Sequence, residues 1–375
     1  MSLLELVQYA TLVVLVLDAV GVGTLIVLKA VNRRRRLATE RRKREYMRLI
    51  SRHVAFEYCT DPIPADAARD PAFIDAIIDF RNVLAGSELA NLERLISRHG
   101  VVRRLIKDLS SPWKVKRLRA AMALAEIGGD ETVDVLLAHL DDREPEIRVQ
   151  AARGLGRIGW TPAIDEIVSR FGRVSPWVRA RFADTLIGFG ADATWPLVAY
   201  VMVNHRHETA GPVAAIRTLA AIGDAQAVKP LMDVLETATD TEVTIAALDA
   251  LGSLGHPMAA PVMRTAATNP DWRIRAKVVT ALGQVGDVGA LEVLATALTD
   301  ESWWVRRNAA AALGAVPGGL DRLYEAVAGD DRFASDAAME ALVDIGELTA
   351  ARMRMEGGIA APRDLALISH VEAHA

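Results

Sequence analysis

Two histidines and a glutamate lie close together at His205, His207 and Glu208, and these residue types could bind a metal. Imidazole and carboxylate groups are common metal ligands. A metal site needs ligands that converge from several elements, however, and the sequence has no second adjacent His–Glu pair. We therefore expect a solvated loop here, and we predict no metal, no cofactor and no catalytic residue. The single cysteine, Cys59, lacks an evident basic partner that would make its thiol a nucleophile.

Aromatic residues make up 5% of the chain, and most tryptophans recur beside basic residues. Each of these groups lies just before or at the start of a predicted helix: Trp113 with Lys114, Trp177 with Arg179, Trp272 with Arg273, and Trp303 and Trp304 with Arg306. If exposed, they would form a ridge for a partner peptide or a base. The alternative is packing between repeats, because large aromatic side chains dominate core energetics. Trp303 and Trp304 are adjacent and cannot both point inward from one helix, so at least one should be exposed.

The elements that position these residues come from a thirteen-residue string, close to V-R-x-x-A-A-x-A-L-G-x-I-G. Its eight copies begin at Lys116, Ile147, Val178, Gly211, Val243, Ile274, Val305 and Ala334. A period near 31 residues indicates a stacked repeat array. Ile147, Ala151 and Leu155 fall on one helical face, and the closing Gly159 suits the left-handed position that ends a helix.

Each copy has a partner helix upstream, and neither helix can cover its apolar stripe alone. The sequence therefore predicts an all-α fold in which helix pairs between residues 116 and 346 stack around a continuous core. Residues 60–115 would form a linker and an N-terminal cap or degenerate repeat, and residues 347–375 a C-terminal cap. Such arrays offer a long binding surface and no obligatory catalytic pocket.

A turn aspartate followed by Val-Arg five and six residues later resembles the short-period repeat of the PBS-lyase-like HEAT family. The matching positions are Asp142, Ile147 and Arg148, then Asn269 (in place of Asp), Ile274 and Arg275, and then Asp300, Val305 and Arg306. The resemblance covers about residues 100–350 and implies a right-handed α-solenoid of about eight HEAT repeats. It indicates little about activity, because the same repeat serves many tasks. Pro212 and Thr244 occupy the arginine position of two copies, so we expect the Asp–Arg ladder to be broken in mid-array, where a bend or a binding site would fit.

A long apolar run fills residues 6–31. From Leu6 to Leu28 it holds 14 Leu, Ile and Val residues, each favouring membrane insertion by about 0.3–0.6 kcal/mol, against about 2.5–3.5 kcal/mol for one central aspartate. Insertion is favoured despite Asp18, so residues 1–31 are predicted to be a transmembrane helix. A cleavable signal peptide fits less well, because no basic segment precedes the run and the run is too long.

Basic residues follow the apolar run, and residues 32–59 are predicted to be a juxtamembrane helix. Its candidates for contact with anionic lipid headgroups are Arg33, Arg34, Arg35, Arg36, Arg41, Arg42, Lys43 and Arg44. Positive residues remain cytoplasmic, so we expect a single-pass protein with its N-terminus outside and its repeats in the cytoplasm. The 37 arginines against 7 lysines are typical of a GC-rich bacterial genome, which places the span in a bacterial inner membrane.

The rest of the chain is acidic. Residues 33–53 carry ten basic and two acidic side chains, a net charge of +8, and the whole chain carries −4, which leaves −12 elsewhere. An acidic repeat array argues against nucleic-acid binding.

Asp18 would lie inside the predicted span, where carboxylates usually face protein or water. It shares a helical stripe with Gly21, while Ala19 and Gly23 form a small-xxx-small pair that lets a second helix approach. Either Asp18 is protonated in a plain anchor, or these four residues dock against another membrane protein.

Together these features predict an interaction protein: a membrane-anchored cytoplasmic HEAT scaffold or accessory subunit within a hetero-oligomer. The layout of one span, a basic segment and HEAT repeats also resembles the bacterial single-span HEAT proteins that accompany membrane glycosyltransferases of family 2. That resemblance implies an envelope-polysaccharide glycosyltransferase as the partner. The alternative is a HEAT-type enzyme, either a bilin lyase or a metal-dependent hydroxylase, although an anchor would hinder a lyase from reaching soluble phycobiliproteins. A HEAT-type DNA glycosylase would need a basic groove.

Overall fold

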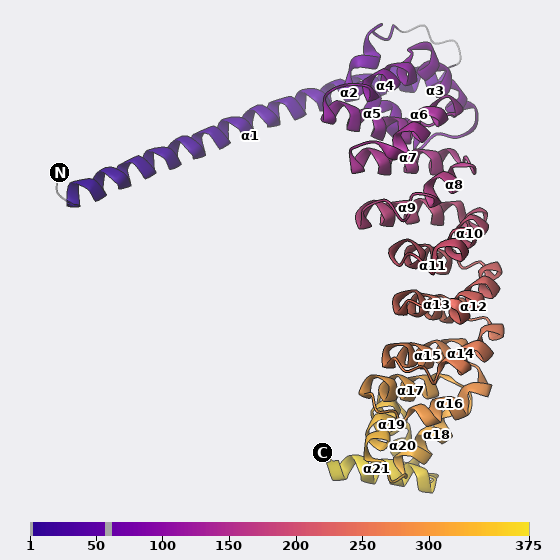
Figure 1. Cartoon of the computed structure of the whole chain (residues 1–375). Coiled ribbons are helices and arrows are strands. Elements are labelled where there is room, and N and C mark those ends of the chain that lie inside the picture. The colour runs from indigo at the N-terminus through magenta and orange to yellow at the C-terminus, as the bar shows by residue number, and fades with distance from the viewer. Residues whose placement is uncertain (1–2, 57–61, 375) are drawn as a thin grey trace. The chain divides into compact units, whose positions relative to one another are not determined.

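The computed structural model describes residues 3–56 and 62–374, and these residues form helices and turns with no strand among them. Their contacts divide the chain into two compact units, Met1–Ile158 (unit 1) and Gly159–Ala375 (unit 2). Within each unit the helices pair and stack in chain order (Figure 1). Among the described residues, the all-α prediction is therefore confirmed.

Unit 1 begins with one uninterrupted helix, α1 (Leu3–Ala55), of 53 residues. The other helices of the unit are α2 (Pro71–Arg81), α3 (Gly86–Arg98), α4 (Val101–Leu109), α5 (Lys114–Ile127), α6 (Val133–Ala138) and α7 (Pro145–Ile158), with short 3-10 helices η1 (Ala67–Arg69), η2 (Asp130–Thr132) and η3 (His139–Asp141).

The C-terminal part of α1 packs against α2 and α3. Ile50 and Val54 are buried there, and the ring of Tyr46 contacts that of Phe73 with 5.1 Å between centroids. The amide of Asn91 on α3 donates a hydrogen bond to the Val54 carbonyl at 2.8 Å. The unit therefore grips α1 at its C-terminal end.

The earlier part of α1 is exposed where its side chains are described. Three of its large apolar side chains, Val22, Val27 and Leu37, are more than half exposed. Exposed apolar residues in such number on one helix are unusual unless another surface covers them. The expected transmembrane segment, 1–31, lies in this part of α1 and remains a prediction.

Unit 2 consists of helix pairs followed by two terminal helices. Its helices are α8 (Ala163–Val168), α9 (Pro176–Phe189), α10 (Thr194–Asn204), α11 (Ala210–Ile222), α12 (Val228–Thr237), α13 (Thr241–Leu254), α14 (Ala260–Ala266), α15 (Trp272–Val285), α16 (Leu291–Ala297), α17 (Trp303–Ala315), α18 (Gly319–Val327), α19 (Arg332–Asp344), α20 (Glu347–Glu356) and α21 (Pro362–His374), with 3-10 helices η4 (Gly190–Ala193), η5 (Ala225–Ala227), η6 (Pro257–Ala259) and η7 (Val288–Ala290).

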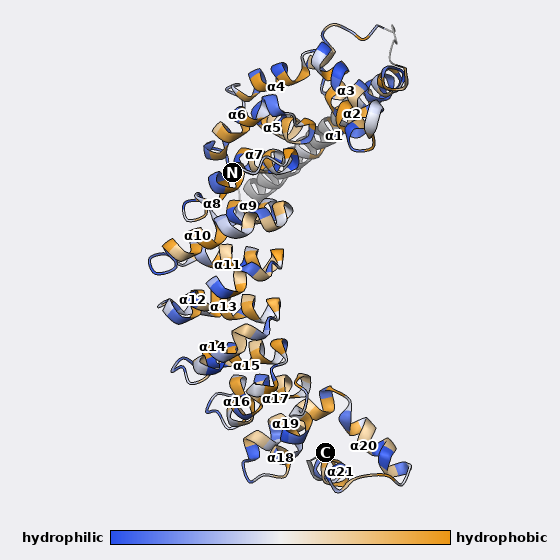
Figure 2. Cartoon of the chain, turned by 90° about the vertical axis from the view of Figure 1, so that its right-hand side faces the viewer, coloured by the Kyte–Doolittle hydropathy of each residue, from blue (hydrophilic) through white to orange (hydrophobic). Residues whose placement is uncertain are grey.

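The second helix of each pair carries the thirteen-residue string, and these helices pack on one another. In unit 2, α11, α13, α15, α17 and α19 contact in succession. Apolar residues of the string, such as Val243 and Val305, are fully buried, and Figure 2 shows hydrophobic residues recurring along the paired helices. Inner glycines permit the close approach: a Cβ on Gly283 would lie 2.9 Å from the Cα of Ala312. The closing glycines have positive φ, as predicted, for example +71° at Gly286.

Residues Pro176–Asn204 also have the length and hydropathy of a membrane-crossing helix. In the fold this stretch is two helices, α9 and α10, joined by η4, with Gly190 at φ +61° where the chain changes direction. Phe182, Leu186 and Leu197 are fully buried. These apolar residues form the core of a repeat, so their hydropathy is explained without a membrane.

Where the Asp–Arg ladder was expected to break, neighbouring repeats still contact each other through other side chains. Arginine is absent at Pro212 and Thr244, but the hydroxyl of Thr209 donates to the Asp240 carboxylate at 2.8 Å, and that of Thr241 donates to Asp271 at 3.3 Å. Threonine hydroxyls thus bridge neighbouring repeats where the guanidinium is missing. Thr244 itself bonds back to the Asp240 carbonyl at 3.0 Å.

Candidate binding surface

The five tryptophans singled out in the sequence lie at the N-terminal ends of second helices and are all substantially exposed. Their exposed fractions are 75% for Trp113, 48% for Trp177, 42% for Trp272, 47% for Trp303 and 51% for Trp304. Packing between repeats is therefore not their main role. Both Trp303 and Trp304 are accessible, and their rings meet edge to face with 4.7 Å between centroids.

Helical geometry explains this exposure. Val178, Ile274 and Val305 open the string and are almost completely buried. A tryptophan one or two positions earlier is rotated by about 100° or 200° around the helix axis, away from the core. It therefore projects from the first turn of its helix into solvent.

In unit 2 the exposed aromatic residues continue over three neighbouring helices. We call Trp272 on α15, Trp303 and Trp304 on α17, and Phe333 on α19 the aromatic row. Phe333 is 64% exposed. Contacts of α15 with α17, and of α17 with α19, place these residues on adjacent repeats at equivalent helix ends.

Arginine side chains accompany the row. The guanidinium of Arg306 lies 5.0 Å from the centre of the Phe333 ring, and that of Arg307 lies 5.4 Å from the Trp303 ring. Both distances are typical of cation–π contacts. Tryptophan and arginine are also the residue types that most often dominate binding energy at protein interfaces.

Not every basic residue predicted for this surface is free to bind. Arg179 donates to the Phe171 carbonyl at 2.6 Å and to the Val174 carbonyl at 3.0 Å, so its role is to cap the loop of its own repeat. Arg273 is half exposed and pairs with Asp271 at 2.8 Å, and it lies 3.7 Å from Glu242 of the preceding repeat.

Two aromatic residues were missed in the sequence. Phe333 occupies the second position of α19, but the copy that begins at Ala334 is degenerate and carries no tryptophan. Trp195 is 57% exposed on α10, a first helix, and its indole nitrogen donates to Gln226 at 3.0 Å. Phe333 directly precedes Ala334, the first residue of its copy. In most of the other copies the position before the first residue is exposed, and this rule could have identified Phe333.

The residues proposed for lipid contact differ among themselves. Arg33, Arg34, Arg36, Arg41 and Arg44 are exposed on α1, and the side chain of Arg35 lies outside the described residues. Arg42 instead pairs with Asp70 at 3.1 Å, and Lys43 with Asp79 at 2.7 Å. The hydrogen bond that Lys43 donates to Asp79 raises the pKa of Lys43 despite partial burial. These two side chains fasten α1 to the rest of unit 1.

The proposed membrane contact belongs to the first half of α1. The backbone of Asp18, Ala19, Gly21 and Gly23 is helical, and the side chains of Asp18 and Ala19 lie outside the described residues, as does Cys59. Docking through these residues remains a prediction.

The expected solvated loop is wrong for His205, which is buried, whereas His207 and Glu208 are exposed. His205 is 3% exposed, with Nδ1 3.0 Å from the Val201 carbonyl and Nε2 3.0 Å from the Thr237 hydroxyl, so both ring nitrogens are occupied. Glu208 accepts a hydrogen bond from the Tyr200 hydroxyl at 3.1 Å. Burial and this neighbouring carboxylate raise the pKa of Tyr200 to about 12. Among the residues that the structure describes, no group of three or more His, Cys, Asp or Glu side chains is placed to hold a metal.

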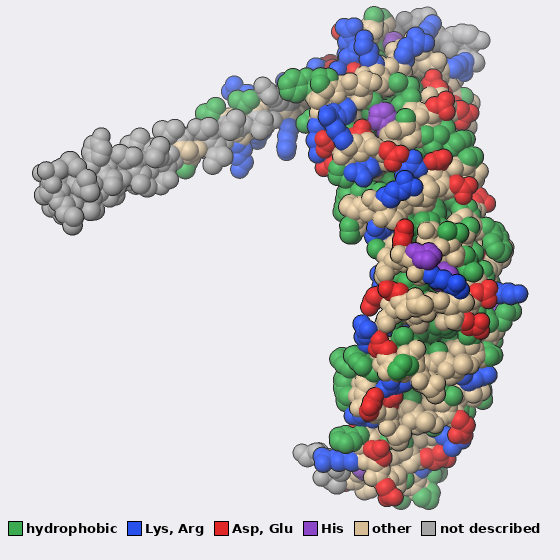
Figure 3. Space-filling view, viewed as in Figure 1, with side chains coloured by type: hydrophobic (Ala, Val, Ile, Leu, Met, Phe, Trp, Pro, Cys, Tyr) green, Lys and Arg blue, Asp and Glu red, His purple; other side chains and the backbone are tan. Residues whose placement is uncertain are grey.

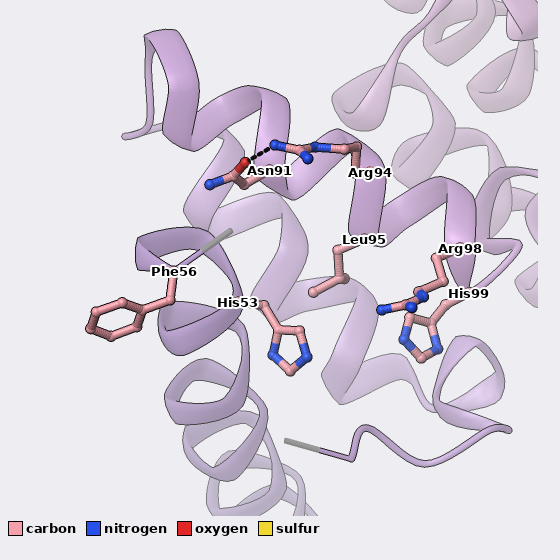
Figure 4. A pocket seen from close by; sticks show the side chains of 7 residues that line it. All are labelled: His53, Phe56, Asn91, Arg94, Leu95, Arg98 and His99. Atoms are coloured by element: carbon pink, nitrogen blue, oxygen red, sulfur yellow. Dashed lines mark hydrogen bonds between the residues drawn. The ribbon is translucent and has the colours of Figure 1, made fainter. Parts of the chain in front are cut away.

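A small pocket of about 280 Å³ lies where α1 meets α3 (Figure 4). Its lining residues are His53, Phe56, Asn91, Arg94, Leu95, Arg98 and His99. Burial, and then the charges of Arg98 and His53, lower the pKa of His99 below its ordinary value. The Asn91 amide joins α3 to α1 through the Val54 carbonyl, and its oxygen accepts from Arg94 of the same helix α3.

On the face of the repeats seen in Figure 3, acidic and basic side chains are interspersed. A duplex-binding groove would present a continuous basic stripe. No continuous stripe of this kind is seen on that face.

A family model described as HEAT repeats matches residues 102–187, 164–252, 207–275, 228–315 and 266–343, which together span 102–343. No curated protein matches the chain in sequence.

Among solved structures, the chain is similar to Kap121p bound to the SUMO protease Ulp1p, with a TM-score of 0.54, 13% identity, and coverage of 75% of this chain and 37% of the karyopherin. It is also similar to Kap95p in complex with RanGDP (TM-score 0.49, 12% identity, 76% of this chain and 47% of that chain). A third similar structure is the CpcE–CpcF complex of phycocyanin lyase from Nostoc sp. PCC7120 (TM-score 0.30, 21% identity, 65% and 94%). The chain spans less than half the length of Kap121p, and at 13% identity that similarity concerns the fold alone.

Proposed function

Because this chain belongs to the HEAT-repeat family, we propose that it is a binding platform, a scaffold or accessory subunit whose repeats hold a partner protein and perform no chemistry of their own. The observation that carries the proposal is the aromatic row. Large apolar side chains placed at equivalent positions of consecutive repeats, and left 42% to 64% exposed, cost solubility unless a partner covers them.

The row also has the chemistry of a protein interface. Its aromatic rings can bury wide, rigid surfaces at low cost in side-chain entropy, and the arginines beside them can bind carboxylates or stack on rings. Arg307 illustrates this dual use, because it lies over Trp303 and also pairs with Glu340 at 3.3 Å. A partner with exposed aromatic or acidic side chains would fit this surface.

We further propose that the platform is anchored in a membrane by residues 1–31, which contain the apolar run, and that it faces the cytoplasm. The 14 aliphatic residues of that run and the basic residues that follow it support this arrangement. A membrane anchor holds the repeats near a membrane-bound partner and raises its effective concentration without adding contacts. By its layout we propose a membrane-integrated glycosyltransferase of envelope polysaccharide as that partner.

The binding role can be tested by purifying the full chain in mild detergent and identifying co-purifying proteins by mass spectrometry. We expect one integral membrane protein in constant ratio, and its loss when Trp272 and Trp304 are both changed to Ser. Trp195→Ser is the matched control, because Trp195 is 57% exposed but lies outside the row. Repeated recovery of the chain alone would remove the proposal.

The anchor can be tested separately with thiol reagents that do not cross membranes. In a Cys59→Ser background, Ser2→Cys should react in intact cells and Ser51→Cys only after the inner membrane is opened. The reverse pattern would invert the topology, and release of the protein by alkaline carbonate would exclude the span.

A further inference from the structure

Unit 1 contains an apolar groove of about 1060 Å³ that neither the repeat core nor α1 fills. It lies between α2, α4 and α5, with α7 at one end, and its volume is at the upper end of the range of small-molecule pockets. Ile74 of α2 and Leu105 of α4 form part of its floor.

One wall of the groove is an exposed stripe of α5. Val115, Leu118 and Met122 follow one another at i, i+3 and i+7, which is the spacing of one helical face. Val115 is 72% exposed and Met122 is 50% exposed, and Trp113, the most exposed tryptophan, continues the stripe at the N-terminus of the helix. Apolar residues at this spacing match the apolar face of a second helix laid along the groove.

The rim of the groove carries more positive than negative charge. Lys116 pairs with Asp108 at 3.1 Å, and Arg153 and Arg157 share Glu126 at 2.7 Å and 2.6 Å. The remaining basic side chains of the rim are Arg69 and Arg119, which form no ion pair within the described part of the chain.

Burial raises the pKa of the remaining acidic group, Asp75, although the charges of Lys43 and Arg119 oppose that rise. With five basic and three acidic side chains, the rim favours a ligand with negative charge on one edge.

We propose that this groove is a docking site for an amphipathic helix of the partner, with an apolar stripe that lies on α5 and acidic residues that pair with Arg69 and Arg119. This inference rests on the proposed function, since it names the kind of segment that the platform holds. The opposite face of α2 is occupied by α1, through the Tyr46–Phe73 ring contact and the Lys43–Asp79 pair, so the groove is the face of α2 that remains for a partner.

Binding can be measured with the full chain in lipid nanodiscs and a fluorescein-labelled synthetic helix that has leucines at i, i+4 and i+7 and glutamates along one edge. A second helix with lysines in place of the glutamates serves as the charge control. Partition of either helix into the lipid is the same for every variant, so only differences between variants count.

We expect the glutamate helix to bind the wild type more tightly than the lysine helix. Val115→Asp should weaken its binding about tenfold or more, because the apolar contact is replaced by a buried charge. Arg119→Glu should remove most of the preference between the two helices, because it leaves four basic and four acidic side chains on the rim. Val83→Asp is the matched control, because Val83 is 82% exposed in the same unit but does not line the groove, and its affinity should equal that of the wild type.

Equal affinities for the two helices, or equal weakening by Val115→Asp and Val83→Asp, would overturn the proposal. A dimer in sedimentation that Val115→Asp dissociates would also overturn it and assign the groove to a second copy. If the groove fails while Trp272 and Trp304 still govern recovery of the membrane partner, only the docking site is lost and the platform remains.

Discussion

Arg275→Ala should be among the most destabilising single substitutions in unit 2. The guanidinium of Arg275 on α15 makes two hydrogen bonds to Asp300 of the next repeat, at 2.7 Å and 2.9 Å. It also donates to the carbonyls of Asn269 and Pro270, at 2.9 Å and 3.1 Å. One side chain thus closes the turn of its own repeat and links that repeat to its neighbour.

The magnitude follows from burial. The side chains of Arg275 and Asp300 are 11% and 13% exposed. Removing one partner of a buried charged pair costs about 3–5 kcal/mol, because the other charge is left without compensation. Lys277 provides the control on the same helix: it pairs with Asp249 at 2.8 Å, but the two side chains are 31% and 44% exposed. Exposed pairs contribute about 0–1 kcal/mol, so Lys277→Ala should have little effect.

Urea unfolding of both variants, together with hydrogen exchange followed by mass spectrometry, measures this difference. Stability of a repeat array is approximately a sum of repeat and interface terms, so Arg275→Ala should weaken the interface between α15 and α17 most. Exchange should rise in both helices and less in α11. A double-mutant cycle with Asp300→Asn should show strong coupling.

The pH dependence gives a second check. Burial opposes ionisation of Asp300, but the hydrogen bonds from Arg275 and from the backbone of Ser302 outweigh it and lower the pKa of the carboxyl below its ordinary 3.8. A carboxyl with a lowered pKa in the folded state stabilises the fold above its ordinary pKa, and this contribution is lost as the pH falls below it. In Arg275→Ala, the free energy of unfolding should fall less steeply as the pH is lowered. A cost equal to that of Lys277→Ala, with unchanged acid sensitivity, would refute the reasoning.

Three further outcomes are expected. Asp364→Asn should loosen α21 and expose it to limited proteolysis, because it removes the ion pair with Arg354. Hydrogen bonding to Arg354 lowers the pKa of the Asp364 carboxyl to about 2, although burial opposes this shift. The wild type should therefore lose the same contact only as the pH falls toward that value. His205→Ala should lower thermal stability while His207→Ala should not, and added zinc should not restore it, since both His205 ring nitrogens serve hydrogen bonds. Thr209→Val should cost about 1 kcal/mol in urea unfolding, the usual net value of one such hydrogen bond.

The repeat pattern was sufficient to predict the helices and their glycine endings, because both depend on local rules. Ile274 and Val305 are apolar at helical spacing and are buried as expected, and Gly286 has the positive φ that a helix ending requires. Whether Trp272 and Trp304 are exposed depends instead on their rotation around the helix axis, one or two residues away from those buried positions. The sequence left both interpretations open.

Contacts between repeats were harder to predict. The absence of arginine at Thr244 suggested a break, but Thr241 and Asp271 form the link from other positions. The groove on unit 1 was not predicted either, because its walls come from three helices, α2, α4 and α5, and the stripe of Val115, Leu118 and Met122 forms only one of them. The apolar stripe of α5 has the spacing of core residues, but it is exposed because no other helix of unit 1 covers it in the described part of the chain.

Because α1 is continuous, its length fixes a distance and its helical twist fixes an orientation. At 1.5 Å per residue, its 53 residues measure about 80 Å, and about 20 Å separate residue 32 from Tyr46, where unit 1 grips it. If the apolar run lies across a bilayer, this stalk sets how far from the lipid the groove can meet a partner. One inserted residue near Leu37 would turn unit 1 by about 100° around the helix axis, whereas seven would nearly restore its direction at a greater height.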